Sequence, residues 1–386
     1  MPSLNNLFGF LQDWISGKLS GFLPPWGVTL AMMAITIVVL LLFLVVTVMY
    51  LTYLERKVLA RIADRLGPNR AGPLGIAQPV ADVLKLVVKE VIVPARADVA
   101  VYFLAPVVMV APALLPYAVL PFGPRMVPAD ISVAVLFVPA VTSITTLALL
   151  MAGWGSGNKY SLLGGLRAVA QKVSYSIPLL LAFLSVVLVT GSLSLVRIVE
   201  AQASYPFLLA QPLGFIIALI CCVAEVNRSP FDIPEAESEL VAGYHTEYSG
   251  VGFAMFFLAE YIGMFTVSAM LAILYLGGWQ GPLLPPYIWF LIKVYLILCV
   301  MFWLRGTFPR VRVDQLMNLS WKVLLPLAMV NVVLVALVDK LGLRLGFLPG
   351  LVGSLVVMAA AGAILRSRRP ARPAAAPRRG WQVREA

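Results

Sequence analysis

The sequence predicts an all-α fold: a polytopic transmembrane helical bundle with about nine spans. Of the 386 residues, 61% are hydrophobic and only 12% are charged, and the mean hydropathy is +0.94. A soluble domain carries about 25% charged residues, so this composition excludes a water-exposed globular protein. The mixture of aliphatic and aromatic residues also excludes fibrous and disordered classes.

The first span is the uncharged stretch between Lys18 and Glu55. Its apolar part, residues 28–54, exceeds the roughly 20 residues that cross a bilayer. It is also too long for a cleaved signal peptide and lacks the basic start of one. Eight further apolar runs follow, at about 100–120, 131–153, 173–195, 206–224, 250–276, 287–304, 319–338 and 345–365.

The basic residues predict the orientation of these spans. With nine spans and the N-terminus outside, 23 of the 29 Lys and Arg residues fall in inner segments, as the positive-inside rule requires. We expect an outer N-terminal segment, 1–27, and a cytoplasmic tail rich in Arg, Pro and Ala, 366–386, which is disordered and lies near anionic headgroups. Between them lies the bundle, 28–365, with cytoplasmic loops 55–99, 225–249 and 305–322.

The first cytoplasmic loop begins with Glu55, Arg56 and Lys57. In residues 79–91, valines and leucines recur at helical spacing while Asp82 and Lys85 occupy the other face. This pattern predicts an interfacial amphipathic helix, which is too polar to span the membrane. The three charges at the start of the loop are either headgroup anchors or functional groups.

The second cytoplasmic loop is acidic. Asp232 and Glu235 have the spacing of a helix N-cap and a first-turn acid. That pattern leaves Glu225, Glu237 and Glu239 unexplained. Carboxylates crowded beside a membrane face raise one another's pKa, which suits groups that take up and pass on protons; the alternative is a solvated acidic loop.

Two charges lie inside the apolar runs themselves, Glu260 and Lys293. Each costs a few kcal/mol unless it faces protein or water. Because Lys293 is nearer to a helix end, its ammonium group can snorkel toward the interface. Glu260 is therefore the better functional candidate.

The third cytoplasmic loop places Arg305, Arg310 and Arg312 beside Asp314. Headgroup anchoring explains arginines alone, whereas contact with another protein or with the acidic loop explains the mixture better. Metal and dinucleotide sites are not expected. The chain has three cysteines without a CxxC pair, one histidine, and no GxGxxG fingerprint after a strand.

Four stretches resemble signature sequences of one family. They are YLERKVLARIADRLGPNRAGPLGIAQPVADVLKLVVKE, GNKYSLLGGLRAVAQKVSY, AEVNRSPFDIPEAESELVAGYHTEYSG and RGTFPRVRVDQLMNLSWKVLLP. They are similar to those of the H subunits of the bacterial proton-translocating NADH:quinone oxidoreductase, respiratory complex I, which are related to mitochondrial NADH dehydrogenase subunit 1. The similarity runs from about Val28 to Asn331, with order and spacing kept.

This resemblance implies a multi-pass subunit of the bacterial cell (inner) membrane. It would lie between a hydrophilic arm with flavin and iron–sulfur clusters and an antiporter-like membrane arm. The implied substrate is a quinone, ubiquinone or menaquinone, while this chain would bind no metal, flavin or cluster. The implied partners are the cluster-bearing and quinone-site subunits, the small and antiporter-like membrane subunits, and the lipid bilayer, with no nucleic acid.

The resemblance also implies roles for individual residues, none of them catalytic in the covalent sense. The expected proton relay comprises Glu55, Glu225, Asp232, Glu235, Glu237, Glu239, Glu260 and Lys293. The expected quinone chamber is lined by Glu55, Arg56, Lys57, Lys85, Phe231 and Arg305. The expected subunit contact is made by Arg310, Arg312 and Asp314.

One position departs from the family pattern. The signature between the third and fourth spans usually ends in Ser-Tyr-Glu, and here it reads Ser174-Tyr175-Ser176. A neighbouring acid or water then replaces the missing carboxylate, or the proton route differs locally.

Two alternative functions remain. The first is the homologous membrane subunit of a membrane-bound hydrogenase or a related reductase, which would not use quinone or NADH. The second is a stand-alone ion or solute transporter, which the lack of an internal repeat disfavours.

Overall fold

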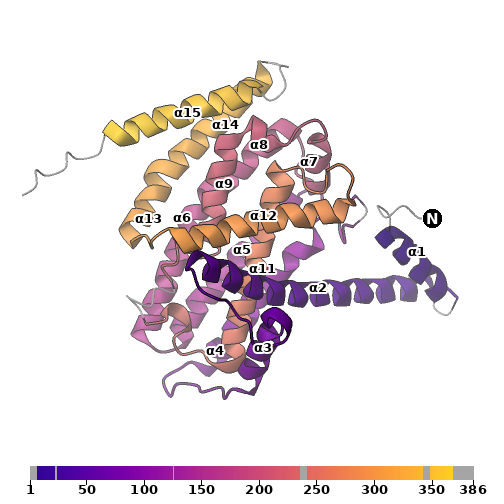
Figure 1. Ribbon diagram of the computed structural model, residues 1–386, viewed down its shortest axis with the longest axis vertical. Coiled ribbons are helices and arrows are strands. Elements are labelled where there is room, and N and C mark those ends of the chain that lie inside the picture. The colour runs from indigo at the N-terminus through magenta and orange to yellow at the C-terminus, as the bar shows by residue number, and fades with distance from the viewer. Residues whose placement is uncertain (1–6, 22–23, 125, 235–240, 342–347, 368–386) are drawn as a thin grey trace, which may run out of the picture.

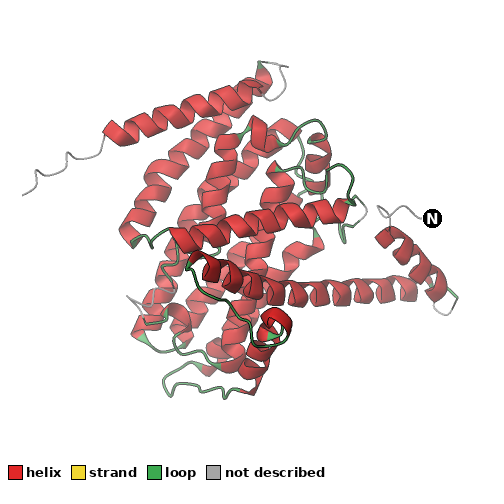
Figure 2. Ribbon diagram, viewed as in Figure 1, coloured by secondary structure: helices red, strands yellow, loops and turns green. Residues whose placement is uncertain are grey.

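The computed structural model describes residues 7–21, 24–124, 126–234, 241–341 and 348–367, and within these ranges it contains helices and no strand (Figure 2). This confirms the all-α prediction. The elements are, in order, α1 (Leu7–Leu19), α2 (Pro25–Ile62), η2 (Pro73–Gly75), α3 (Gln78–Val88), α4 (Val99–Leu114), η3 (Leu115–Ala118), α5 (Ala134–Gly155), α6 (Lys159–Thr190), α7 (Leu195–Ala201), α8 (Phe207–Ala210), α9 (Pro212–Glu225), η4 (Gly243–His245), α11 (Gly250–Tyr275), α12 (Pro286–Thr307), α13 (Val313–Leu319), η5 (Ser320–Leu324), α14 (Leu325–Lys340) and α15 (Leu348–Ser367).

Seven of the described helices are long and apolar enough to cross a membrane. They are α2, α4 with η3, α5, α6, α11, α12 and the continuous stretch from α13 to α14. Two shorter apolar helices, Pro212–Glu225 and Leu348–Ala361, lie at the positions of the remaining two apolar runs. The chain is therefore a membrane protein, and a count of nine spans stays a prediction.

Several helices continue beyond their apolar runs. Helix α2 extends to Ile62, so Glu55 and its two basic neighbours lie on a helix and not in a loop. Helix α6 begins at Lys159, where the Asn158 side chain accepts a hydrogen bond from the Tyr160 amide at 2.9 Å and caps the first turn. Charged residues are good helix formers, so the end of an apolar run does not mark the end of a helix.

Helix α11 lies at the centre of the bundle. Of its most apolar 18-residue window, 83% is buried inside the protein, and it packs against α4, α12, α9 and α2 (Figure 1). Small residues let other helices approach closely: a Cβ on Gly153 of α5 would lie 2.8 Å from the Ser161 carbonyl oxygen of α6. The core is thus built from tightly packed helices around α11.

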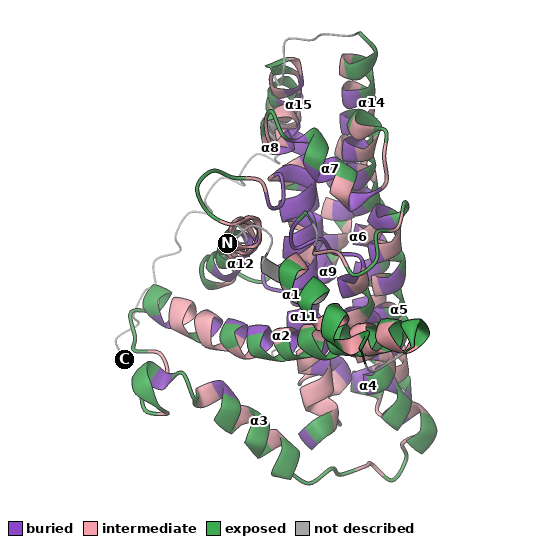
Figure 3. Cartoon of the chain, turned by 90° about the vertical axis from the view of Figure 1, so that its right-hand side faces the viewer, coloured by how far each residue is buried: buried purple, intermediate pink, exposed green. Residues whose placement is uncertain are grey.

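Helix α2 extends away from the bundle, and much of its surface is exposed (Figures 1 and 3). Only 17% of its most apolar window is buried. Helix α2 contacts η2, the turn before α3, through the Tyr53 hydroxyl, which donates to the Leu74 carbonyl at 3.0 Å. The helix predicted from the amphipathic pattern of residues 79–91 is present as α3, which ends at Val88 and so does not include Val91; its interfacial location stays a prediction.

Candidate functional site

A buried charge network joins α2, the loop after α9, α11 and α12. Glu55 Oε1 accepts hydrogen bonds from Arg228 Nη1, at 3.3 Å, and from Arg305 Nη1. Glu55 Oε2 accepts from the Tyr261 hydroxyl at 2.6 Å. Arg228 Nε in turn lies 2.9 Å from Glu260 Oε1. The network thus brings two arginines together with two glutamates.

Arg228 is the central residue of this network. Its side chain is only 6% exposed, and those of Glu55 and Glu260 are 4% and 9% exposed. Its guanidinium also lies over the ring of Tyr261, 4.5 Å from the centroid, in a cation–π contact. Buried charges persist where they are paired, and Arg228 forms an ion pair with both carboxylates.

The loop that carries Arg228 is held against α6. Gln171 Nε2 donates to the carbonyl oxygens of Ala224 and Phe231, at 2.8 Å each. Asn227 adopts a left-handed backbone conformation, with φ of 54°, which lets the chain turn sharply at the end of α9. One buried side-chain amide thus fixes both ends of the loop.

A second cluster lies on α5, α6 and α9. Lys172 Nζ donates to Thr145 Oγ1 at 2.9 Å and is 3.8 Å from Glu225 Oε1. Ser176 Oγ lies 3.3 Å from Glu225 Oε2. At the position where the resemblance implies a glutamate, the hydroxyl of Ser176 contacts the neighbouring carboxylate of Glu225.

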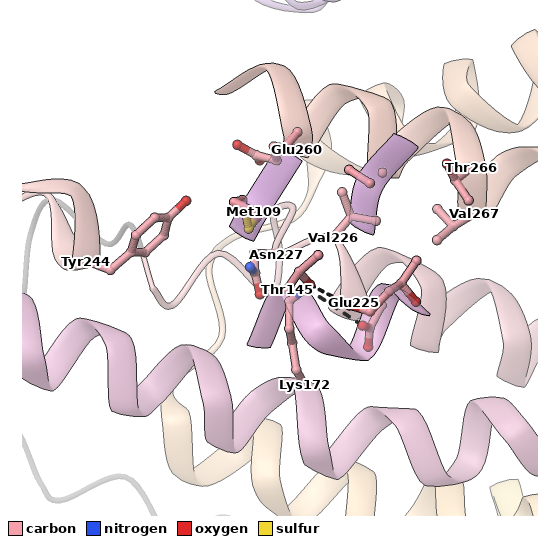
Figure 4. A pocket seen from close by; sticks show the side chains of 14 residues that line it. Met109, Thr145, Lys172, Glu225, Val226, Asn227, Tyr244, Glu260, Thr266 and Val267 are labelled. Carbon is pink, nitrogen blue, oxygen red and sulfur yellow. Dashed lines mark hydrogen bonds and ion pairs between the residues drawn. The ribbon is translucent and has the colours of Figure 1, made fainter. Parts of the chain in front are cut away.

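A cavity of about 50 Å³ lies between these two groups of charges (Figure 4). Glu225, Lys172, Asn227 and Glu260 all contribute to its wall. Asn227 Oδ1 is buried and has no hydrogen-bond partner among the described residues. One water molecule needs roughly 10–15 Å³ of cavity volume, so this cavity has room for a few water molecules between Glu225 and Glu260.

Asp232 lies at the edge of the network, in the loop after Arg228. Its Oδ2 is 3.4 Å from Arg310 Nη2, and its Oδ1 is buried without a hydrogen-bond partner in the described part of the chain. Burial raises the pKa of Asp232 to about 6, against the opposing attraction of Arg310 and with a further increase from Glu260. The Asp232–Arg310 contact joins the loop after α9 to the loop after α12, as the mixed charges of the second of these loops suggested.

The expected chamber residues on α2 and α3 lie near one another. Arg56 Nη1 is 2.6 Å from Asp82 Oδ2, so an ion pair connects the two helices. Lys57 Nζ lies 5.5 Å from the centroid of the Tyr53 ring, and Lys85 is exposed on α3. Phe231, the remaining chamber candidate, is buried next to the network, and Arg312 and Asp314 are exposed at the start of α13.

Lys293 lies apart from the other expected relay residues. Its Nζ donates to the carbonyl oxygens of Leu276, at 2.6 Å, and Gln280, at 2.7 Å. It precedes Arg305 on α12 by 12 residues, about 18 Å along a helix. The structure therefore gives Lys293 a role in fixing the end of α11 and does not bring it to the relay.

The three remaining relay candidates, Glu235, Glu237 and Glu239, lie outside the described residues.

Sequence reasoning missed four residues that form the site, Arg228, Lys172, Tyr261 and Thr145. In the sequence Arg228 is only a basic neighbour of the acidic loop, and Lys172 only adds to the basic count that sets the orientation. A usable signal existed for Lys172, which precedes Ser176 by four residues and so lies on the same face of α6. Nothing in the sequence pairs Arg228 with Glu55, because 173 positions separate them.

Comparison with known proteins agrees with the four signature stretches. The model of a family described as NADH dehydrogenase matches residues 35–336. The chain belongs to this family. Similar members, each named as the H subunit of an NADH-quinone oxidoreductase, occur in Dehalococcoides mccartyi strain CBDB1, 50% identical over 78% of this chain and 85% of the relative, and in Brevibacillus brevis, 48% identical over 82% and 95%. A third, from Syntrophobacter fumaroxidans and named as the second H subunit of such an oxidoreductase, is 48% identical over 83% and 96%.

Proposed function

We propose that this chain is the membrane subunit of a proton-translocating NADH:quinone oxidoreductase. In this proposal it forms the quinone-entry chamber and couples quinone reduction to proton movement through its buried carboxylates. One observation carries the proposal: Arg228 connects Glu55 to Glu260, and Glu260 shares a cavity with Glu225. A charge change at one end of this chain of contacts is therefore felt at the other.

The quinone end of this path is the junction of α2, α3 and α12. Arg305 contacts Glu55, and its side chain is 34% exposed, so its guanidinium has surface left for a ligand. The carbonyl oxygens of a quinone head group accept hydrogen bonds of the kind that a guanidinium donates. Reduction to quinol takes two electrons and two protons, and the electrons come from cofactors in partner subunits.

The coupling step is a redistribution of charge within the network. A negative charge that forms on the quinone near Arg305 draws this arginine away from Glu55, so Glu55 binds Arg228 more closely and Arg228 binds Glu260 less closely. At an effective dielectric constant of about 20, an ion pair at 4 Å is worth about 4 kcal/mol, and doubling the distance removes about half of it. A change of about 2 kcal/mol corresponds to more than a tenfold change in an equilibrium constant such as that for proton binding at Glu260.

Water in the cavity then carries the proton between Glu260 and Glu225. Lys172 and Ser176 hold Glu225 in place, while Asn227 offers an acceptor for water on the cavity wall. From Glu225 the proton would pass toward antiporter-like partner subunits. This path uses Ser176 as a hydrogen-bonding neighbour and does not require a carboxylate at that position.

The orientation and the partner contacts belong to the same proposal. The excess of basic residues in the inner segments supports an N-terminus outside and a C-terminus in the cytoplasm of a bacterial cell. Arg310 and the exposed Arg312 and Asp314 would then face the hydrophilic arm, with its cluster-bearing and quinone-site subunits. An assembly with these subunits would also supply the flavin and iron–sulfur clusters.

The test uses membranes that contain the assembled complex. Glu225→Gln and Glu260→Gln keep side-chain volume and remove charge, and the measurements are NADH-dependent quinone reduction and proton pumping per assembled complex. We expect both variants to lose most of their pumping. Glu200→Gln, on the exposed face of α7, is the matched control and should pump normally.

Two results would contradict the proposal. If both cavity variants pump protons as well as the control, the buried carboxylates are only packing groups. If the tagged chain purifies alone as a stable monomer with transport activity and without cluster-bearing proteins, it is a transporter.

A further inference from the structure

A second cavity, of about 140 Å³, lies where α4 and α11 begin. It shares no lining residue with the cavity between Glu225 and Glu260. Its wall comes from the first turns of these two helices, from the residues just before α11 and from the segment after α3, and it includes Val91, Tyr102, Phe103, Tyr248, Val251 and Met255. The proposed function makes no use of this cavity.

The segment after α3 is fixed against the start of α11. Ser249 Oγ donates to the Glu90 carbonyl at 3.1 Å, and the Ile92 amide donates to the same hydroxyl oxygen at 3.4 Å. Gly250 has φ of 57°, and a Cβ on it would lie 2.8 Å from a carbonyl oxygen of this segment. Glycine allows both the positive φ and the close approach. Val91 is therefore held in the cavity wall by contacts of the backbone around it.

The hydroxyl donors of the lining residues are already engaged. The rings of Tyr102 and Tyr248 stack, with centroids 4.2 Å apart and planes inclined by 2°. The Tyr248 hydroxyl donates to the Tyr102 carbonyl, and the Tyr102 hydroxyl donates to the Glu247 carbonyl, each at 2.9 Å. Ser249 donates to Glu90, as described above. The cavity thus offers mainly aliphatic and aromatic surface, which favours an apolar occupant.

The cavity is large enough for part of a hydrocarbon chain. An apolar protein cavity of roughly 150 Å³ stays dry and binds benzene, so the present volume has room for a few methylene groups. Three of the lining side chains are partly exposed, namely Val91 at 43%, Phe103 at 52% and Val251 at 43%. Since α4 and α11 are apolar enough to cross a membrane, the hydrocarbon that reaches these side chains is that of the bilayer.

Two basic residues belong to the segment that carries Val91. Lys89 and Arg96 are both exposed between α3 and α4. Of the acids in this segment, Glu90 is exposed, whereas the Asp98 carboxylate accepts hydrogen bonds from two amides at the start of α4. Lysine and arginine donate charge-assisted hydrogen bonds to phosphate oxygens. An apolar cavity beside such side chains matches a molecule with an acyl chain and a phosphate.

We propose that this cavity binds an acyl chain of a membrane phospholipid, whose phosphate lies beside Lys89 and Arg96. The methylene groups nearest to the glycerol would occupy the cavity. The tail of a quinone is also hydrocarbon, but its head group has no phosphate for the basic side chains to bind. The bound lipid would tie the segment after α3 to the first turns of α4 and α11. This inference does not depend on quinone chemistry.

The test uses the assembled complex in lipid nanodiscs of phosphatidylethanolamine and phosphatidylglycerol. A small fraction of the phosphatidylglycerol carries a photoreactive group near the glycerol end of one acyl chain. We expect mass spectrometry to find the label on the cavity wall, above all on Phe103 and Met255. Val91→Trp fills the cavity from its edge and should lose most of this labelling. Val88→Trp, on an 83% exposed position of α3 outside the cavity, is the matched control and should keep it.

A second probe tests the phosphate contact. Diacylglycerol with the same photoreactive chain has no phosphate, so it should label the cavity less than phosphatidylglycerol does. The double variant Lys89→Gln/Arg96→Gln should remove this difference between the two probes. Arg197→Gln, at an exposed position on α7, is the control and should preserve it.

Three outcomes would overturn the proposal. They are unchanged labelling in Val91→Trp, equal labelling of the wild-type cavity by the two probes, and a cryo-electron microscopy map in which a partner's side chain or a quinone tail fills the cavity. A map of the wild-type complex with an elongated lipid density there would support it even if Val91→Trp fails to assemble. Failure of the quinone and pumping experiments would leave these results unaffected, so the two proposals are tested separately.

Discussion

Replacement of Arg228 by methionine removes the cation that lies between two buried carboxylates. Arg228 Nη1 is 3.3 Å from Glu55 Oε1, and its Nε is 2.9 Å from Glu260 Oε1. Removal of one partner of a buried ion pair costs about 3–5 kcal/mol of stability, because a buried charge is left uncompensated. Since Glu55 keeps Arg305 and Tyr261 as partners, we expect most of this cost to arise at Glu260.

The assay compares the purified complexes that carry each variant. The amount of assembled complex on native gels and the temperature at which NADH:quinone reductase activity is lost should both fall for Arg228→Met. Arg197→Met, at an exposed position on α7, is the control and should change stability by less than about 0.5 kcal/mol.

A second-site variant makes the test specific. Glu260→Gln in the Arg228→Met background should recover part of the lost stability, because a neutral amide does not need the missing cation. Equal losses for the two arginine variants, or no recovery in the double variant, would refute the reasoning.

Three further predictions concern other positions. Burial raises the pKa of Asp232 to about 6, so the contribution of this carboxyl group to stability is fully present below the unfolded pKa near 3.8 and is lost as the pH rises through 6. The thermal inactivation temperature should therefore fall between pH 4 and 7. The variant Asp232→Asn should show a smaller fall over the same pH range. Lys293→Met removes two charge-assisted hydrogen bonds and should lower stability by about 1.5–3 kcal/mol for each of them. Activity per assembled complex should stay normal. A selective loss of proton pumping would show instead that Lys293 belongs to the relay. Gly164→Ala would place a Cβ 2.7 Å from the Tyr244 amide nitrogen and should reduce assembly on native gels, whereas Gly17→Ala, with open space around it, should assemble normally.

Hydrophobicity predicts where helices lie better than where they end. Apolar runs located all seven long helices because lipid and protein interiors both select for apolar side chains. The charged continuation of α2 through Glu55 to Ile62 reads as a loop in the sequence, since a helix that leaves the bilayer has no hydropathy signal. The break between α8 and α9 also escapes prediction, because it lies within one apolar run, 206–224.

The sequence pointed to the carboxylates of the candidate site and to Arg305, but not to Arg228 or Lys172. Glu55 and Glu260 stood out because charges in or beside an apolar run are rare. Arg228 gave no comparable signal, since basic residues are expected in inner segments, and the only signal for Lys172 was its spacing of four residues from Ser176. Pairing is a property of the packed helices, so only the structure could show that Arg228 contacts both glutamates and that Lys293 contacts neither.

The length of α2 makes the protein sensitive to hydrophobic mismatch. Its uncharged stretch, residues 28–54, would be about 40 Å long as a helix, against a hydrocarbon core of about 30 Å. A helix that is too long for its bilayer accommodates by tilting, and a thinner membrane increases the tilt. Glu55 follows directly at the end of this stretch, so a change in tilt displaces the carboxylate against its arginine partners. We therefore expect the thickness of the surrounding lipid to act on the charge network, with acyl-chain length as a means to adjust it.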